Sequence, residues 1–172
     1  MPAKRHLSVA VLASMAALLT AASFADSTSA DDAYLDGLLG RWIMTGTLGG
    51  KPVTYEAAGE RVLDGAWLQL HLVDTGKPPQ YRADVFISND AKEHDFIAHW
   101  LDQFGAAGAR VVATGHRDGE RLVLVFPYAD GAFRDTFRKG HADAWTLLIE
   151  SQAKNGSWST FASYKLSRPR KK

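Results

Sequence analysis

The stretch WTLLIESQAKNGSWSTFASYKL, residues 145–166, decides the fold class. Asn155-Gly156 stands near its centre, and this dipeptide strongly favours a two-residue hairpin turn because both positions tolerate a positive φ. The runs on either side, 145–154 and 157–166, contain the aromatic and β-branched residues that are common in strands. The sequence therefore predicts an antiparallel hairpin close to the C-terminus.

The same pattern of short β runs and turn residues continues back toward the N-terminus. In residues 66–74, for example, Leu68, Leu70 and Leu72 alternate with polar or aromatic neighbours. Before the first run, residues 33–39 (AYLDGLL) predict one helical turn that ends at Gly40. Besides the two strands of the hairpin, the predicted strands are 41–48, 53–63, 66–74, 82–88, 94–102, 110–116, 121–128 and 133–138.

About ten strands joined by short turns, with no long helix for a parallel crossover, predict an all-β fold of antiparallel strands. Strands that pair in sequential order close most simply into an up-and-down barrel, which leaves no exposed edge. A β-sandwich is the competing architecture, and the consecutive hairpins favour the barrel. Neither a repeat nor a linker divides the sequence, so we expect one barrel domain over residues 33–167.

The composition is that of a globular protein. The 172 residues are 46% hydrophobic and 23% charged and include no cysteine, which excludes collagen-like, disordered and disulfide-stapled classes. The formal net charge of +1 gives no sign of a nucleic-acid-binding protein, which would normally show a basic excess.

The first 25 residues are predicted to be a secretory signal peptide. Lys4 and Arg5 precede an apolar run over 7–19, and Ser23-Phe24-Ala25 supplies small residues for cleavage, with 28–30 as a second possible site. The apolar run of about 13 residues is shorter than the ~20 that span a bilayer, and no cysteine follows it to carry a lipid anchor. A periplasmic or secreted protein without a stable membrane anchor is expected.

Cleavage after Ala25 would change the formal charge from +1 to −1, because it removes two basic residues and no acidic one. We expect residues 26–32 to be a flexible lead-in, since they are small and polar. The basic residues within 168–172 flank Pro169 and are expected to form a solvated tail.

Three segments resemble a bacterial lipocalin-like family of unknown function whose members are small and often exported. They are 38–46 (LLGRWIMTG), 64–68 (DGAWL) and 134–137 (RDTF), and the first contains the Gly-x-Trp signature of the lipocalin and fatty-acid-binding superfamily. The resemblance implies a calycin-type barrel with an interior cavity and brings no established reaction. It also implies that Trp42 plugs the closed end beneath a basic residue near the last strand, either Lys165 or Arg168.

A more distant similarity links the Leu-Leu-Gly-x-Trp opening to nitrobindin-type barrels, which ligate haem through a histidine close to the C-terminus. Here the last predicted strand contains no histidine, and His141 precedes the penultimate strand. Common zinc-binding spacings of histidine are also absent from the sequence. We therefore expect neither haem nor another cofactor, and no metal.

Asp135 is the most suggestive polar residue, because it alternates with Phe133 and Phe137 on one strand face. A carboxyl group inside a barrel loses its hydration, so it needs a partner or has a raised pKa. Asp102 is similar by alternation with Trp100, although it also stands where its strand is expected to end. The alternative for Asp135 is a structural salt bridge with an arginine on a neighbouring strand.

We predict that the barrel binds a small, mostly apolar molecule without catalysis. Which strand face lines the interior depends on the register, since a slip of one residue inverts every assignment. Two alternatives remain: an isomerase or hydrolase that uses an Asp/His acid–base pair in the same cavity, and a filled barrel that acts as an envelope interaction module. The candidate wall residues are Trp67, Phe96, Trp100, Phe133 and Phe137, and the candidate polar anchors are His71, His99 and Asp135.

Overall fold

The computed structural model describes residues 30–141 and 144–170, and the predicted signal peptide lies outside this part of the chain. One short helix, α1 (Ala30–Asp36), precedes the strands. The strands are β1 (Gly40–Leu48), β2 (Lys51–Val62), β3 (Trp67–Asp74), β4 (Arg82–Asp90), β5 (Asp95–Asp102), β6 (Val112–Asp118), β7 (Arg121–Phe126), β8 (Phe133–Lys139), β9 (Trp145–Gln152) and β10 (Trp158–Ser167). A 3-10 turn, η1 (Gly105–Ala107), follows β5.

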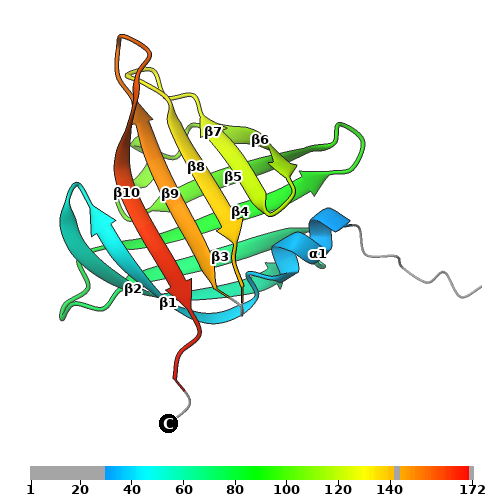
Figure 1. Ribbon diagram of the computed structural model, residues 1–172, viewed down its shortest axis with the longest axis horizontal. Coiled ribbons are helices and arrows are strands. Elements are labelled where there is room, and N and C mark those ends of the chain that lie inside the picture. The colour runs from blue at the N-terminus through cyan, green and yellow to red at the C-terminus, as the bar shows by residue number, and fades with distance from the viewer. Residues whose placement is uncertain (1–29, 142–143, 171–172) are drawn as a thin grey trace, which may run out of the picture.

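The strands form a closed antiparallel barrel in which each strand pairs with its neighbours in sequence and β1 pairs with β10 (Figure 1). The predicted up-and-down barrel with a short helical turn is therefore confirmed. The predicted hairpin joins β9 to β10, but residues 153–157 form its connection instead of two residues, and Gly156 has a positive φ of +83° whereas Asn155 does not. Closure removes the free edges that an open sheet would expose.

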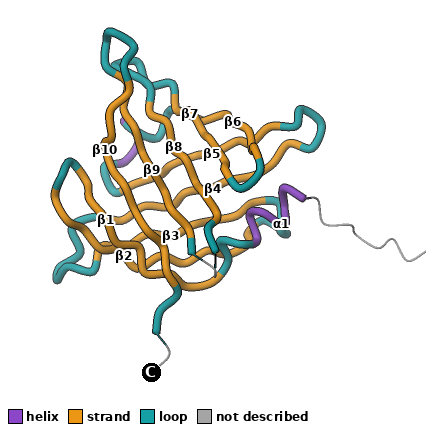
Figure 2. The backbone as a smooth tube through the Cα atoms, in the orientation of Figure 1, coloured by secondary structure: helices purple, strands orange, loops and turns teal. Residues whose placement is uncertain are grey.

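The barrel is flattened, and β8, β9 and β10 cross over β3, β4 and β5 (Figure 1). Most loops lie at the two ends of the strands (Figure 2). A Cβ atom at Gly46 would overlap the carbonyl oxygen of Ser163, and one at Gly115 would overlap that of Val123. Glycine at these two positions thus permits the close approach of adjacent strands. Within the described ranges, no helix has the length and apolar character to cross a membrane.

The helix α1 and the segment after it close one end of the barrel. Leu35 and Leu38 are fully buried there, and Tyr34 is 4% exposed. The Tyr34 hydroxyl donates a hydrogen bond of 3.1 Å to the carbonyl oxygen of Phe137, and its ring meets Trp145 edge to face at 5.0 Å between centroids. The helix is thereby fixed to both β8 and β9.

Trp42 is buried at this closed end, with 1% of its surface exposed. Its Nε1 donates a hydrogen bond of 2.8 Å to the carbonyl oxygen of Leu38. The Arg168 guanidinium lies 3.5 Å from the ring centroid, and its Nη1 donates to the carbonyl oxygen of Leu39 at 2.7 Å. Of the two basic candidates, Arg168 therefore covers Trp42, whereas Lys165 is exposed on β10.

Two expected boundaries are wrong. The helix begins at Ala30, so residues 30–32 belong to it rather than to a flexible lead-in; 26–29 lie outside the described residues. Ion pairs hold this helix, because Arg117 contacts Asp31 at 2.6 Å and Arg61 contacts Asp36 at 2.8 Å. At the other boundary, Arg168 was expected in a solvated tail, but its guanidinium packs on Trp42 at the closed end although the residue is exposed; 171–172 lie outside the described residues.

Candidate functional site

A cavity of about 550 Å³ occupies the end of the barrel opposite α1. Its walls come from the inward faces of the strands, and its mouth comes from the loops at this end. Most of the lining is apolar or aromatic. The lining residues are Met44, Leu48, Val53, Tyr55, Leu72, Asp74, Gln80, Tyr81, Trp100, Asp102, Phe104, Gly108, Phe126, Tyr128, Phe133, Asp135, Ile149, Phe161 and Tyr164.

Contacts between aromatic rings fix the shape of the cavity wall. Tyr55 meets Tyr81 and Tyr164 edge to face, at 5.9 and 5.8 Å between centroids. The Trp100 indole donates a hydrogen bond of 2.9 Å to the Tyr81 hydroxyl, so that hydroxyl retains its own proton for donation. Burial raises the pKa of Tyr81 and Tyr164, which keeps both phenols neutral at physiological pH.

The mouth is also aromatic. Phe104, in the loop after β5, is 72% exposed, and Phe161 on β10 is 41% exposed. Phe161 meets Phe133 edge to face at 5.1 Å. Large apolar side chains at a solvent-exposed rim offer a first contact surface for an apolar ligand.

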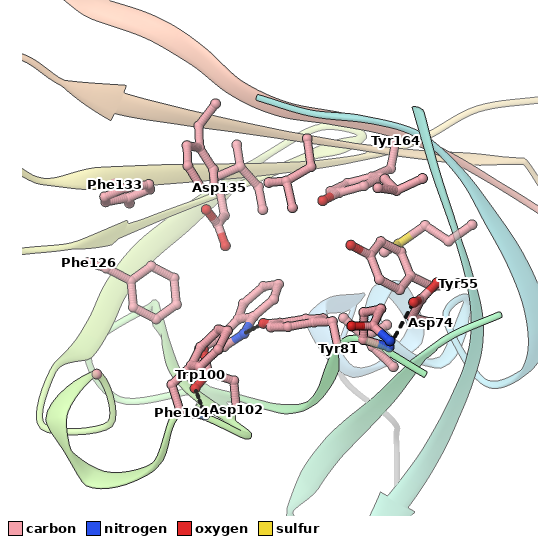
Figure 3. A pocket seen from close by; sticks show the side chains of 18 of the residues that line it. Tyr55, Asp74, Tyr81, Trp100, Asp102, Phe104, Phe126, Phe133, Asp135 and Tyr164 are labelled. Atoms are coloured by element: carbon pink, nitrogen blue, oxygen red, sulfur yellow. Dashed lines mark hydrogen bonds between the residues drawn. The ribbon is translucent and has the colours of Figure 1, made fainter. Parts of the chain in front are cut away.

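Asp135 projects into the cavity from the middle of β8, with Phe133 and Tyr164 on the same side and Trp100 opposite (Figure 3). It is 3% exposed, and it is the one charged residue among the described residues that is buried. No hydrogen bond or ion pair joins its carboxyl group to another described residue. Loss of hydration therefore raises the pKa of Asp135 to about 8.

The salt bridge considered for Asp135 is not formed among the described residues. The adjacent Arg134 points outward, where it pairs with Glu150 at 2.8 Å and stacks over Trp158 at 4.4 Å from the centroid. The residues directly opposite Asp135 on the flanking strands are Leu124 and Ile149, which offer no polar atom from their side chains. Asp135 therefore faces the cavity without a hydrogen-bond or ion-pair partner among the described residues.

Two further carboxylates line the mouth, and both accept hydrogen bonds from the backbone. Asp74 accepts them from the amides of Gln80 at 2.9 Å and Gly76 at 3.2 Å. These hydrogen bonds lower the pKa of Asp74, and the bond from Gln80 has the larger effect. Asp102, at the end of β5, accepts one from the amide of Phe104 at 2.9 Å. Asp102 thus both ends its strand and lines the cavity.

Three of the eight predicted site residues come together in the cavity wall, namely Trp100, Phe133 and Asp135. Phe96 and Phe137 also point inward, but they are 1% and 0% exposed and belong to the packed core toward the closed end. Alternation places each of them on the same strand face as a residue that lines the cavity, Trp100 or Phe133, whereas their position along the barrel axis depends on the pairing of all ten strands.

The other three predicted residues, Trp67, His71 and His99, point out of the barrel. In β3 the inner face is occupied by Leu68, Leu70 and Leu72. Trp67 and His71 are on the outer face, where His71 Nδ1 lies 2.7 Å from an Asp84 carboxylate oxygen. On β5, His99 Nε2 lies 2.6 Å from the carbonyl oxygen of Ala109. None of the histidines in the described ranges lines the cavity, so an Asp/His pair is not assembled there.

Sequence reasoning missed the tyrosines Tyr55, Tyr81 and Tyr164. Two of them carried a usable signal, since Tyr55 alternates with Ala57 in β2 and Tyr164 alternates with Ala162 and Leu166 in β10. Tyr81 precedes β4 in a loop, where periodicity gives no information.

Comparison with known proteins assigns the chain to no family. No protein-family model matches the chain, and no curated protein matches it.

Proposed function

We propose that this protein is an exported, lipocalin-like carrier that binds a small, mostly apolar molecule inside the barrel. The observation that carries the proposal is the open cavity of about 550 Å³ with an aromatic wall and one buried, unpartnered carboxyl group. Pockets for small molecules generally measure ~300–1,000 Å³ and combine apolar walls with a few polar groups. The stack of Arg168 on Trp42 supports the lipocalin-like assignment, because the resemblance implies it.

The two alternatives receive less support. An acid–base mechanism of the Asp/His type needs a histidine beside Asp135 or Asp102, and the described histidines face away from the cavity. An interaction module with a filled barrel needs a packed interior at both ends. Here packing is complete only toward α1, where Trp42, Phe137 and Trp145 are almost fully buried.

Filling the cavity should weaken ligand binding without unfolding the barrel. We expect Ile149→Trp to weaken binding of the neutral fluorophore N-phenylnaphthylamine by at least about tenfold, a change of about 1.4 kcal/mol in binding free energy. Ile149 faces the cavity beside Asp135, so the larger ring would take the space of the ligand. Fluorescence titration measures the affinity, and circular dichroism confirms the β fold.

The matched control is Leu148→Trp, which adds a ring at the next position of β9, on the outer face. Its affinity should equal that of the unmodified protein. Equal weakening by both variants, or none by Ile149→Trp, would place the fluorophore elsewhere and contradict the proposal. Native mass spectrometry and an absorption spectrum of gently purified protein would then weigh or identify any molecule carried from the cell.

A further inference from the structure

The carboxyl groups that line the cavity have no basic side chain among the described lining residues. They belong to Asp74, Asp102 and Asp135, and none of the described lining residues is lysine, arginine or histidine. A fatty acid or another anionic ligand would place its charge beside these carboxyl groups with no cation to receive it. An unpaired, desolvated charge discriminates strongly against a ligand. The cavity is therefore unsuited to apolar anions.

No described residue of the cavity supplies a partner for the carboxyl group of Asp135. Its side chain is almost fully buried, it makes no hydrogen bond or ion pair with a described residue, and it points into the open space (Figure 3). A buried carboxylate is stable when a cation lies beside it and restores the interactions lost with water. The missing counter-charge can be delivered by the ligand.

The aromatic wall suits the same chemistry. Trp100, Tyr81 and Phe126 face the space into which Asp135 projects (Figure 3). The faces of aromatic rings attract ammonium groups, and quaternary ammonium ligands are recognised by cages of such rings. At the mouth, Asp74 and Asp102 add negative charge along the entry route, which raises the local concentration of cations.

We propose that the ligand is a hydrophobic monocation, an amine or quaternary ammonium with an apolar body, whose cationic head pairs with Asp135 while its body lies against the aromatic wall. This inference rests on the proposed function, since it names the ligand class of the same cavity. In this proposal Asp135 binds the cationic head of the ligand, and the aromatic side chains of the wall contact its apolar body and attract its positive charge.

The head group determines how binding depends on pH. On β7 and β9 the residues opposite Asp135 are apolar, and the titratable groups that interact with it electrostatically are Tyr128 and Tyr164, with Asp102 near Tyr128. Burial raises the pKa of both tyrosines, so neither ionises near neutral pH. A quaternary ammonium carries no proton to lose. Its affinity should therefore rise as Asp135 ionises, by more than about tenfold between pH 6 and pH 8.

The test compares three probes that share one tail: phenylbutyltrimethylammonium, phenylbutanol and phenylbutyrate. Calorimetric titration of the full chain at about pH 8 should show the cation binding at least about tenfold more tightly than the alcohol, and the carboxylate binding most weakly. Asp135→Asn should remove the preference for the cation and retain binding of the alcohol. Asp118→Asn makes the same change of charge at the exposed end of β6, outside the cavity lining, and should behave like the unmodified protein.

Each outcome decides one question. If the alcohol or the carboxylate binds as tightly as the cation, or if the preference survives Asp135→Asn, the inference is overturned and the proposed binding function stands. A cation affinity that does not rise between pH 6 and pH 8 also overturns it. If neither N-phenylnaphthylamine nor any of the three probes binds, the proposed binding function is contradicted, and this inference is contradicted with it.

Discussion

The variant Asp135→Asn is expected to be more stable than the unmodified protein at alkaline pH and equally stable near pH 4. Asparagine has almost the same shape as a protonated aspartate and never becomes charged. Asp135 has no hydrogen bond or ion pair with a described residue to lose. The substitution therefore removes the cost of a buried charge without creating a cavity.

The sign follows from proton linkage. The pKa of Asp135 is about 8 in the folded protein and near its ordinary value of 3.8 in the unfolded chain. Between these values the folded protein retains a proton that the unfolded chain has released, so the free energy of unfolding falls as pH rises. Below this window both states are protonated, and above it the full cost is present. The difference of about four in pKa corresponds to roughly 5 kcal/mol above pH 8.

Urea unfolding of both proteins at about pH 4, 6 and 9 measures this difference directly. The gap between them should widen across the series, and the exposed control Asp118→Asn should show no such widening. A gap that stays constant with pH, or a variant that is less stable at pH 9, would show that Asp135 is ionised and stabilised in the folded protein.

Replacing Trp42 by alanine is expected to cost about 3–5 kcal/mol, the range typical of a buried tryptophan or phenylalanine. The change removes a side chain that is 1% exposed, deletes the hydrogen bond to Leu38 and leaves the Arg168 guanidinium without its ring. For a domain of this size the melting temperature should fall by about 10–20 °C. Thermal unfolding followed by circular dichroism measures it.

Trp158→Ala is the matched control for this prediction. Trp158 also lies beneath an arginine, Arg134, at 4.4 Å from the ring centroid, but it is half-buried on the outside of the barrel. Its loss should cost much less, because little apolar surface leaves the core. Equal costs for the two substitutions would mean that Trp42 does not secure the closed end.

Local patterns in the sequence predict the strands well, because turn residues and alternation act over a few positions. Residues 145–154 and 157–166 were expected as strands, and the structure places β9 and β10 within one or two residues of those limits. Alternation puts Asp135 and Phe133 on one face of their strand, and both line the cavity. In β3 the alternating leucines occupy the inner face, so Trp67 and His71, which are expected in the cavity from the sequence, lie on the outer face instead.

Two properties of the site could not be predicted, because they arise only when the barrel closes. Alternation divides β5 into two faces, but it does not say that Trp100 lines the interior and His99 lies outside. Alternation also does not give the position of an inward residue along the barrel axis. That position is what distinguishes Phe133, at the mouth of the cavity, from Phe137, in the packed core. Tyr81 enters the wall from a loop and was missed for the same reason.

The seam between β1 and β10 has a consequence for how the chain acquires its structure. Met44 pairs with Leu166 across it, so closure joins segments about 120 residues apart. Contacts of such long range form slowly, because a large loop must close before they stabilise the fold. The barrel cannot be completed until β10 has been synthesised, and until then β1 and β9 each present an open edge to which another strand could pair.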